Sequence, residues 1–382
     1  MKRSLIYSFL LLLISSILIF LKFNLVPQNI SFDEIAFTKL ALSLNHSNYI
    51  PYSNLATGHS TLYFYIILLS FKIFGVSNFA LRFPSAIFGI LSILVFFVLL
   101  KNVLKEGGNP YFSFLGAFIL ITSRWFINFS RFSFEATFLL FIELLSLLFI
   151  LLFIKKRNNL LLFLSAIFAG LSFLSYTPGR IFFLLPLTFL FIKKINFKKI
   201  FYFILTFLII SAPLIFYLLV HKDVRVTKIS VFSQNVSVPL KLSYISNNIQ
   251  KTALMFNISG DMNGRHNFPG KSALNPILGI LFILGIILAG RNIHDYKNKI
   301  FLFYFLISIF PTLITQPIDN PNMLRTFTAL PSVIYFIVYS IKNIAEYKFN
   351  FNKKTIYVFI AVLISLSSIY ELNTYFKYQS RV

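Results

Sequence analysis

The sequence predicts an all-α protein that crosses a membrane many times. Of its 382 residues, 57% are hydrophobic and only 12% are charged, and the mean hydropathy is +0.80. Many apolar runs approach the length of about 20 residues that spans the hydrocarbon core of a bilayer. In lipid the backbone must satisfy its own hydrogen bonds, so such runs are expected to be helices.

The basic residues support this prediction through their placement. The formal net charge is +24, but the lysines and arginines mostly form short clusters between apolar runs. Cytoplasmic loops of membrane proteins carry such clusters, so we do not expect nucleic acid as a partner. The chain has no cysteine, which excludes disulfides and thiolate metal sites.

Each apolar run is a candidate helix, and we take them in chain order. They lie near residues 4–21, 60–76, 79–100, 111–127, 137–154, 159–175, 181–192, 200–220, 275–290, 300–315, 324–341 and 355–370.

The basic clusters decide which runs cross the membrane. If every run crosses, Lys101 and the cluster 155–157 lie on the side opposite to Lys2 and Arg3. If the run 60–76 instead lies along the outer face, the clusters all become cytoplasmic, as the positive-inside rule requires. The sequence therefore predicts about eleven transmembrane helices, an outer-face interfacial helix at 60–76 and a cytoplasmic N-terminus in the plasma membrane.

This topology places two long loops outside. Residues 1–382 are expected to form a single integral membrane domain, with a first outer loop at 22–78 and a long outer loop at 221–274. Most charges that the cytoplasmic clusters do not contain fall in outer loops. We therefore expect a polar site on the outer face.

The adjacent carboxylates Asp33 and Glu34 are the first candidates for that site. Acidic residues number only 11, and this pair follows the first apolar run. A helix that starts near Ser31 would also favour acids in its first turn. The functional alternative is a general base that takes a hydroxyl proton, with a second carboxylate beside it.

Arg131 and Glu135 form the second candidate group. They are four residues apart at the end of an apolar run, so a helix would place them on one face. A plain ion pair between them is the simpler interpretation.

Arginines at the outer ends of other runs point to an anionic ligand. Arg82, Arg180 and Arg325 each stand alone at such a position. Any one of them could reach lipid headgroups from its run. Together with Arg131 and Arg265 they predict a cationic cleft, because guanidinium groups bind phosphate in a bidentate manner.

The remaining candidates are His59 and, in the long outer loop, Asp261, Arg265 and His266. Histidines that stand alone are more often hydrogen-bonding groups than metal ligands. If the protein uses a cofactor, a divalent cation such as Mg²⁺ or Mn²⁺ on Asp33 and Glu135 fits the available oxygen ligands better than zinc does. There is no nucleotide-binding motif, so an activated donor must arrive ready-made.

Several motifs, in this order and spacing, resemble the dolichyl-phosphate-mannose protein mannosyltransferase family, and they are also similar to the lipid A aminoarabinose transferases of the same superfamily. The motifs are Phe32-Asp33-Glu34, the segment from His59 to Tyr65, Phe74 to Ser77 running into Leu81-Arg82-Phe83-Pro84-Ser85, Ser130-Arg131 to Glu135, and Gly260 to Gly270.

The resemblance implies a GT-C glycosyltransferase fold and an inverting transfer of a sugar from a polyprenyl-phosphate donor. It implies that Asp33 is the catalytic base and that Glu34 and Glu135 help to position donor, acceptor or cation. It also implies that Arg131 and Arg325 neutralise the departing lipid phosphate. Where many members have prolines after the position of His59, this chain has Ser60 and Thr61.

The function expected from these observations is transfer of a hexosyl or pentosyl group to an acceptor hydroxyl on a protein, a lipid or a glycan. Arg82, Arg131, Glu135, Arg180, Arg325 and His59 are expected at the donor phosphate. Two alternatives stay open at this point. One is a lipid or sugar transporter or flippase, although the acids here gather at one face rather than at the midplane. The other is a glycan polymerase or ligase.

Overall fold

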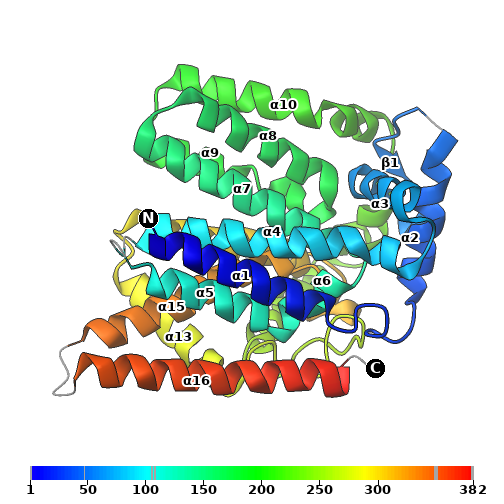
Figure 1. Cartoon of the computed structure of the whole chain (residues 1–382). Helices are drawn as coiled ribbons and strands as arrows, with labels where there is room; N and C mark the ends of the chain where they lie inside the picture. Colours follow the sequence, from blue (N-terminus) through cyan, green and yellow to red (C-terminus); the bar gives the residue numbers. More distant parts are fainter. Residues whose placement is uncertain (1, 47, 105, 107–108, 348–351, 380–382) are drawn as a thin grey trace.

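The fold is a bundle of long helices whose polar residues collect at one end (Figure 1). The computed structural model describes residues 2–46, 48–104, 106, 109–347 and 352–379. The helices are α1 (Lys2–Phe20), α2 (Phe32–Ser43), α3 (Leu62–Phe74), α4 (Asn78–Leu104), α5 (Tyr111–Thr122), α6 (Arg124–Arg131), α7 (Glu135–Lys156), α8 (Asn159–Ser175), α9 (Leu184–Ile192), α10 (Phe197–Val220), α11 (Val224–Ile229), α12 (Val238–Met255), α13 (Pro276–Arg291), α14 (Tyr296–Leu313), α15 (Leu330–Glu346) and α16 (Lys353–Asn373).

Short elements complete the chain between these helices. Two antiparallel strands, β1 (Tyr52–Ser53) and β2 (His59–Ser60), pair with each other. The single-turn helices are η1 (Leu44–His46), η2 (Leu55–Thr57), η3 (Thr177–Ile181), η4 (Val231–Ser233), η5 (Pro317–Asp319), η6 (Phe327–Ala329) and the π-turn η7 (Thr374–Tyr378).

The helix α7 lies at the centre of the bundle and most of its side chains are buried, whereas α1 and α16 lie at its edge (Figure 1). On α1, Leu5, Phe9 and Ile17 are exposed. Apolar surface of this kind is stable in lipid rather than in water. Close packing is visible where α13 meets α15. A Cβ added at Gly285 would collide with the backbone carbonyl of Phe336, so the two helices approach backbone to backbone.

The length of the helices agrees with a multi-pass membrane protein. In the part of the chain that the structure describes, six helices are long and apolar enough to cross a bilayer, or seven if α5 and α6 form one bent span. Four further apolar segments are shorter, with 10–17 residues each: Leu62–Phe74, Asn159–Ser175, Thr177–Ile192 and Pro276–Arg291. The figure of eleven crossings stays a prediction.

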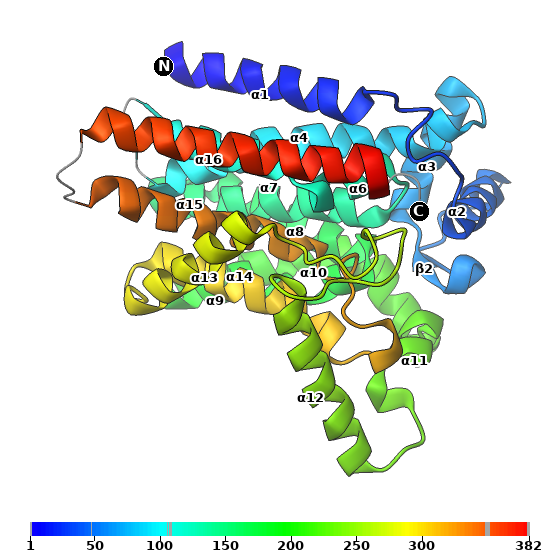
Figure 2. The same cartoon turned by 90° about the horizontal axis from the view of Figure 1, so that it is seen from below.

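The predicted interfacial helix 60–76 corresponds to α3. It has 13 residues, so it is about 20 Å long and too short for a 30 Å core. Both α2 and α3 lie across the end of the bundle rather than along it (Figures 1 and 2).

The apolar run 111–127 was expected to be one continuous helix, and this expectation is wrong. The chain breaks at Ser123, and α5 and α6 meet at 59°. Directly after the break, the buried guanidinium of Arg124 lies 2.7 Å from the carbonyl of Ser272 and 3.4 Å from the carboxylate of Glu371. A charged group inside the bundle must find such partners.

Candidate functional site

Asp33 lies in the first turn of α2, at the end of the bundle where α1 ends. Ser31 caps this helix, and its hydroxyl accepts from the N–H of Glu34 in a capping box. The Asp33 side chain is 34% exposed and forms an ion pair with Arg265 of the segment between α12 and α13. The capping contacts therefore belong to Ser31 and Glu34, and the Asp33 carboxylate takes no part in them.

Glu34, in contrast, has no exposed surface. Its two oxygens accept from Arg82 Nε at 2.7 Å and Arg82 Nη2 at 2.9 Å. The backbone N–H groups of Ser31 and Ser133 donate to the same carboxylate. Glu34 thus joins α2, α4 and the segment before α7, and its geometry is that of a residue that positions Asp33. A direct contact between Glu34 and the reacting atoms does not fit this burial.

Arg82 and Arg131 also have roles that differ from the prediction. Besides Glu34, Arg82 donates to the carbonyls of Pro27 and Asn29, each at 3.0 Å. The fully buried Arg131 donates to backbone carbonyls between residues 18 and 26. Their donors hold the first loop, so the predicted contact of Arg82 and Arg131 with a lipid phosphate is corrected. The sequence pattern alone cannot distinguish a carbonyl from a phosphate as the partner of an arginine.

Glu135 and His59 form a buried pair instead of the predicted Arg131–Glu135 pair. His59 Nδ1 lies 2.7 Å from Glu135 Oε1, and His59 Nε2 lies 2.6 Å from Arg225 Nη1. Nε2 also lies 2.9 Å from the carbonyl of Ala56, so this nitrogen has a donor and an acceptor beside it, while Nδ1 faces the Glu135 carboxylate. Burial lowers the pKa of His59 and the Arg225 cation lowers it further, which favours the neutral ring.

Arg225 is a site residue that the sequence reasoning missed. It lies on α11, and its guanidinium stands over the Tyr176 ring at 5.4 Å. In the described part of the chain no carboxylate forms a salt bridge with it. Burial lowers the pKa of Arg225, but Tyr176, Glu135 and Asp33 together raise it by more, so the guanidinium stays charged. Asp33 therefore acts on Arg225 electrostatically. Its position just after the apolar run 200–220 is the same signal that identified Arg180 and Arg325.

Arg225, Arg180 and Arg325 line one cavity of about 180 Å³. Its other walls are largely apolar and come from η3, α11 and α14, with Ile181, Phe310 and Ile314 among them. This arrangement places cations beside a surface suited to a hydrocarbon chain.

Two carboxylates balance part of the positive charge in this cavity. Arg180 forms an ion pair with Asp223, and Arg325 lies 3.2 Å from Asp319. Burial raises the pKa of Asp223, but Arg180, the N–H of Val226 and the Tyr52 hydroxyl together lower it by more, so the carboxylate stays ionised. Arg225 therefore remains as the cation available to an anionic ligand.

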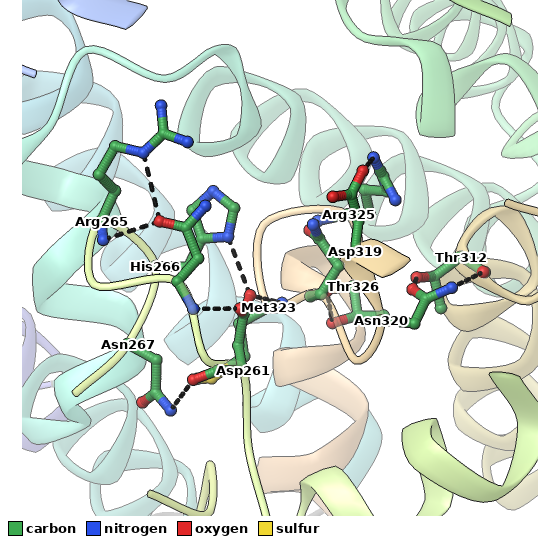
Figure 3. Close-up of polar contacts among 12 residues, drawn as sticks. Asp261, Arg265, His266, Asn267, Thr312, Asp319, Asn320, Met323, Arg325 and Thr326 are labelled. Carbon is green, nitrogen blue, oxygen red and sulfur yellow. Dashed lines mark hydrogen bonds and ion pairs between the residues drawn. The ribbon is translucent and has the colours of Figure 1, made fainter. Parts of the chain in front are cut away.

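The remaining candidates hold the loop that carries Arg265. Asp261 Oδ2 accepts from His266 Nδ1 and from the N–H of Met323, both at 2.8 Å, and joins two loops (Figure 3). Asp261 and His266 are both buried. We assign them to the support of Arg265, which faces Asp33.

The predicted metal ligands lie in different surroundings. Asp33 is paired with Arg265, and Glu135 with His59. No group of three or more His, Cys, Asp or Glu side chains that could hold a metal ion exists within the described residues. This donor set does not fit the predicted Mg²⁺ or Mn²⁺ ion.

Comparison with known proteins gives a partial family match and a fold likeness. Residues 58–217 match the family model of dolichyl-phosphate-mannose-protein mannosyltransferase. No curated protein sequence matches significantly. The structure is similar to ArnT from Cupriavidus metallidurans bound to undecaprenyl phosphate, with a TM-score of 0.59 and 10% identity over 96% of this chain and 74% of that chain.

It is also similar to the oligosaccharyltransferase AglB from Archaeoglobus fulgidus in complex with an inhibitory peptide and a dolichol-phosphate. The TM-score is 0.60 and the identity 15%, over 99% of this chain and 56% of that chain. At these identities the likeness concerns the fold. The structure therefore has the fold of these GT-C glycosyltransferases, and the family match covers residues 58–217 of the chain.

Proposed function

We propose that the protein transfers a sugar from a polyprenyl-phosphate-linked donor to an acceptor hydroxyl, with inversion at the anomeric carbon. The observation that carries the proposal is the cavity in which Arg180, Arg225 and Arg325 face apolar walls. A lipid phosphate needs both, because its head is anionic and its tail is apolar. The ArnT and AglB structures hold undecaprenyl phosphate and a dolichol-phosphate, which supports this class of donor.

The charge distribution supports an outer-face location. The helix α7 begins at Glu135 beside the site and ends at Lys155 and Lys156, while α4 begins near Arg82 and ends with Lys101 in its last turn. The basic ends of both helices therefore lie away from the site. Under the positive-inside rule those ends are cytoplasmic, so the site faces outward.

In the proposed reaction the acceptor oxygen attacks the anomeric carbon while the bond from that carbon to the phosphate oxygen breaks. The leaving polyprenyl phosphate takes the bonding electrons, and Asp33 takes the hydroxyl proton. Arg225 is expected to stabilise the charge that develops on the phosphate, aided by Arg325. Asp33 must exchange its contact with Arg265 for the acceptor hydroxyl, so Arg265 is expected to hold Asp33 in place between turnovers.

Asp33→Asn in proteoliposomes with a polyprenyl-phosphate sugar tests the base. Loss of a general base costs about 10²–10⁴-fold in rate. Transfer is therefore expected to fall by this factor, with binding of polyprenyl phosphate unchanged. Asp295→Asn, at the cap of α14, is the matched control and should transfer normally. Near-normal turnover by Asp33→Asn would refute the assignment.

The same assay addresses two further questions. Sugar appearing across the vesicle membrane without a new glycosidic bond would indicate a transporter. Activity that survives a chelator would show that the predicted divalent cation is not required.

A further inference from the structure

The helix α12 projects sideways from the bundle, across the direction of the long helices (Figure 2). Its surroundings divide its surface into three arcs. The first arc packs against the protein and is largely polar, since the polar residues Asn248 and Thr252 are buried there together with Met255. A soluble amphipathic helix would bury its apolar face instead.

The second arc is apolar and exposed. Val238 is 68% exposed, Leu242 62% and Ile249 51%. The spacing of these residues, with Ala253 four positions further on, keeps them on one side of the helix. We call this set of four residues the apolar stripe.

The third arc is polar and exposed. It borders the apolar stripe and contains Ser243, Ser246, Asn247 and Gln250, with Leu254, which is 36% exposed, as its apolar member. A helix that lies flat in a membrane interface needs this arrangement, with one side in the acyl region and the adjacent side in water.

Charge and position favour a bilayer as the partner of the stripe. Between Asp223 and Asp261 the chain has no acidic residue and four basic ones, namely Arg225, Lys228, Lys241 and Lys251. Basic segments are attracted to anionic lipid headgroups. The helix α14, which contacts α12, also exposes apolar side chains, namely Leu306 and Phe310.

The packed arc connects α12 to the arginine-lined cavity. Asn248 Nδ2 donates to the carbonyls of Leu313 and Thr315, at 3.0 and 2.6 Å. Lys251 Nζ donates to the carbonyl of Pro317 at 3.2 Å. The segment 313–317 thus links the helix to the cavity wall, which includes Thr315.

We propose that α12 is an interfacial anchor. Its apolar stripe is immersed in the leaflet at the site end of the bundle, and its polar arc faces water. This anchoring role is separate from the proposed transferase function and does not depend on which sugar is transferred. It holds one wall of the cavity at the depth of the lipid headgroups.

The absence of native cysteine makes a direct test possible. Single variants Leu242→Cys and Ile249→Cys probe the stripe, Gln250→Cys probes the polar arc, and Leu219→Cys on α10 serves as a lipid-exposed reference. Each is labelled with an environment-sensitive fluorophore in liposomes of phosphatidylglycerol and phosphatidylcholine. Quenching is measured with nitroxide-labelled lipid and with iodide on both sides of the membrane.

Labels at 242 and 249 should be quenched by lipid nitroxide as strongly as the label at 219, and several-fold more than the label at 250. Iodide should give the reverse order. Equal iodide quenching at 242, 249 and 250 would overturn the proposal, because the helix would then stand in water. Protection of the stripe from both quenchers would overturn it as well, because a protein partner would cover the stripe. Sugar transfer is not read out, so failure of the transferase proposal leaves this result unchanged.

Discussion

Replacing Glu34 with Gln tests whether the Glu34–Arg82 pair organises the site. The pair is bidentate, with contacts of 2.7 and 2.9 Å, and both side chains are almost completely buried. Glutamine has nearly the same shape, so the change removes the charge with little change in packing. Arg82 keeps its two carbonyl partners but loses its counter-ion.

The expected cost follows from this burial. Removing one partner of a buried ion pair leaves an uncompensated charge and costs about 3–5 kcal/mol. The capping-box contact to the Ser31 N–H is weakened too, which adds up to about 1 kcal/mol. At roughly 2 °C for each kcal/mol in a large chain, the melting midpoint should fall by about 6–12 °C.

The assay is thermal unfolding in a fixed detergent, followed by fluorescence and by the fraction of protein that stays monodisperse. Glu346→Gln is the matched control, because Glu346 is largely exposed and its contact with Lys342 is 3.8 Å. Surface pairs of this kind contribute little, so the control should melt with the parent protein.

The double variant Glu34→Gln/Arg82→Met completes the test. Removing both charges should recover part of the loss, because no unpaired ion is left. If Glu34→Gln melts within 1–2 °C of the parent, the buried pair contributes no more than a surface pair, and the reasoning is refuted. If the melting midpoint of the double variant is no higher than that of Glu34→Gln, Arg82 stabilises the protein through its carbonyl contacts.

Three further outcomes are expected. Arg225→Gln should weaken equilibrium binding of a short polyprenyl phosphate about 10–100-fold, because hydrogen bonds to charged groups contribute about 1.5–3 kcal/mol; unchanged affinity would remove Arg225 from the donor site. Arg180 holds the pKa of Asp223 in the folded state below its usual value near 4. The contribution of this pair to the free energy of unfolding is therefore complete above about pH 4 and is lost as pH falls through the lower pKa of the folded state. Asp223→Asn should thus reduce the melting midpoint at pH 6–8 but not in strong acid, and an equal reduction at both would contradict the pair. Gly285→Ala should destabilise by about 1–3 kcal/mol in the same melting assay through a clash between α13 and α15, while Gly290→Ala, with open space around it, should be neutral or stabilising.

The predicted site residues separate into groups that the sequence could not distinguish. Arg82, Arg131, Arg180 and Arg325 share one pattern, a single arginine at the outer end of an apolar run. The first two point at backbone carbonyls of the first loop, and the other two line a cavity. The difference depends on where the first loop passes, and that is set by packing between distant helices.

Arg225 and Arg124 both show that a local sequence pattern does not predict contacts between distant segments. Arg225 follows its apolar run by a few residues and gains its importance only when α11 folds back beside His59 and Tyr176. Arg124 looks like a minor interruption of an apolar run until its partners Ser272 and Glu371 are known. Both partners are more than a hundred residues away along the chain, beyond the range of any local pattern.

The sequence by itself determined the class of the protein. Apolar runs of membrane length and basic clusters between them are local properties, so they predict helices, the bundle and the polar end without knowledge of any contact. Only the tertiary structure decided which charges act and which ones hold the fold. Asp33 and Glu34 are neighbours in sequence, yet one is exposed beside Arg265 and the other is buried against Arg82. Burial and pairing depend on segments that meet only after folding, and they determine the chemistry of a carboxylate.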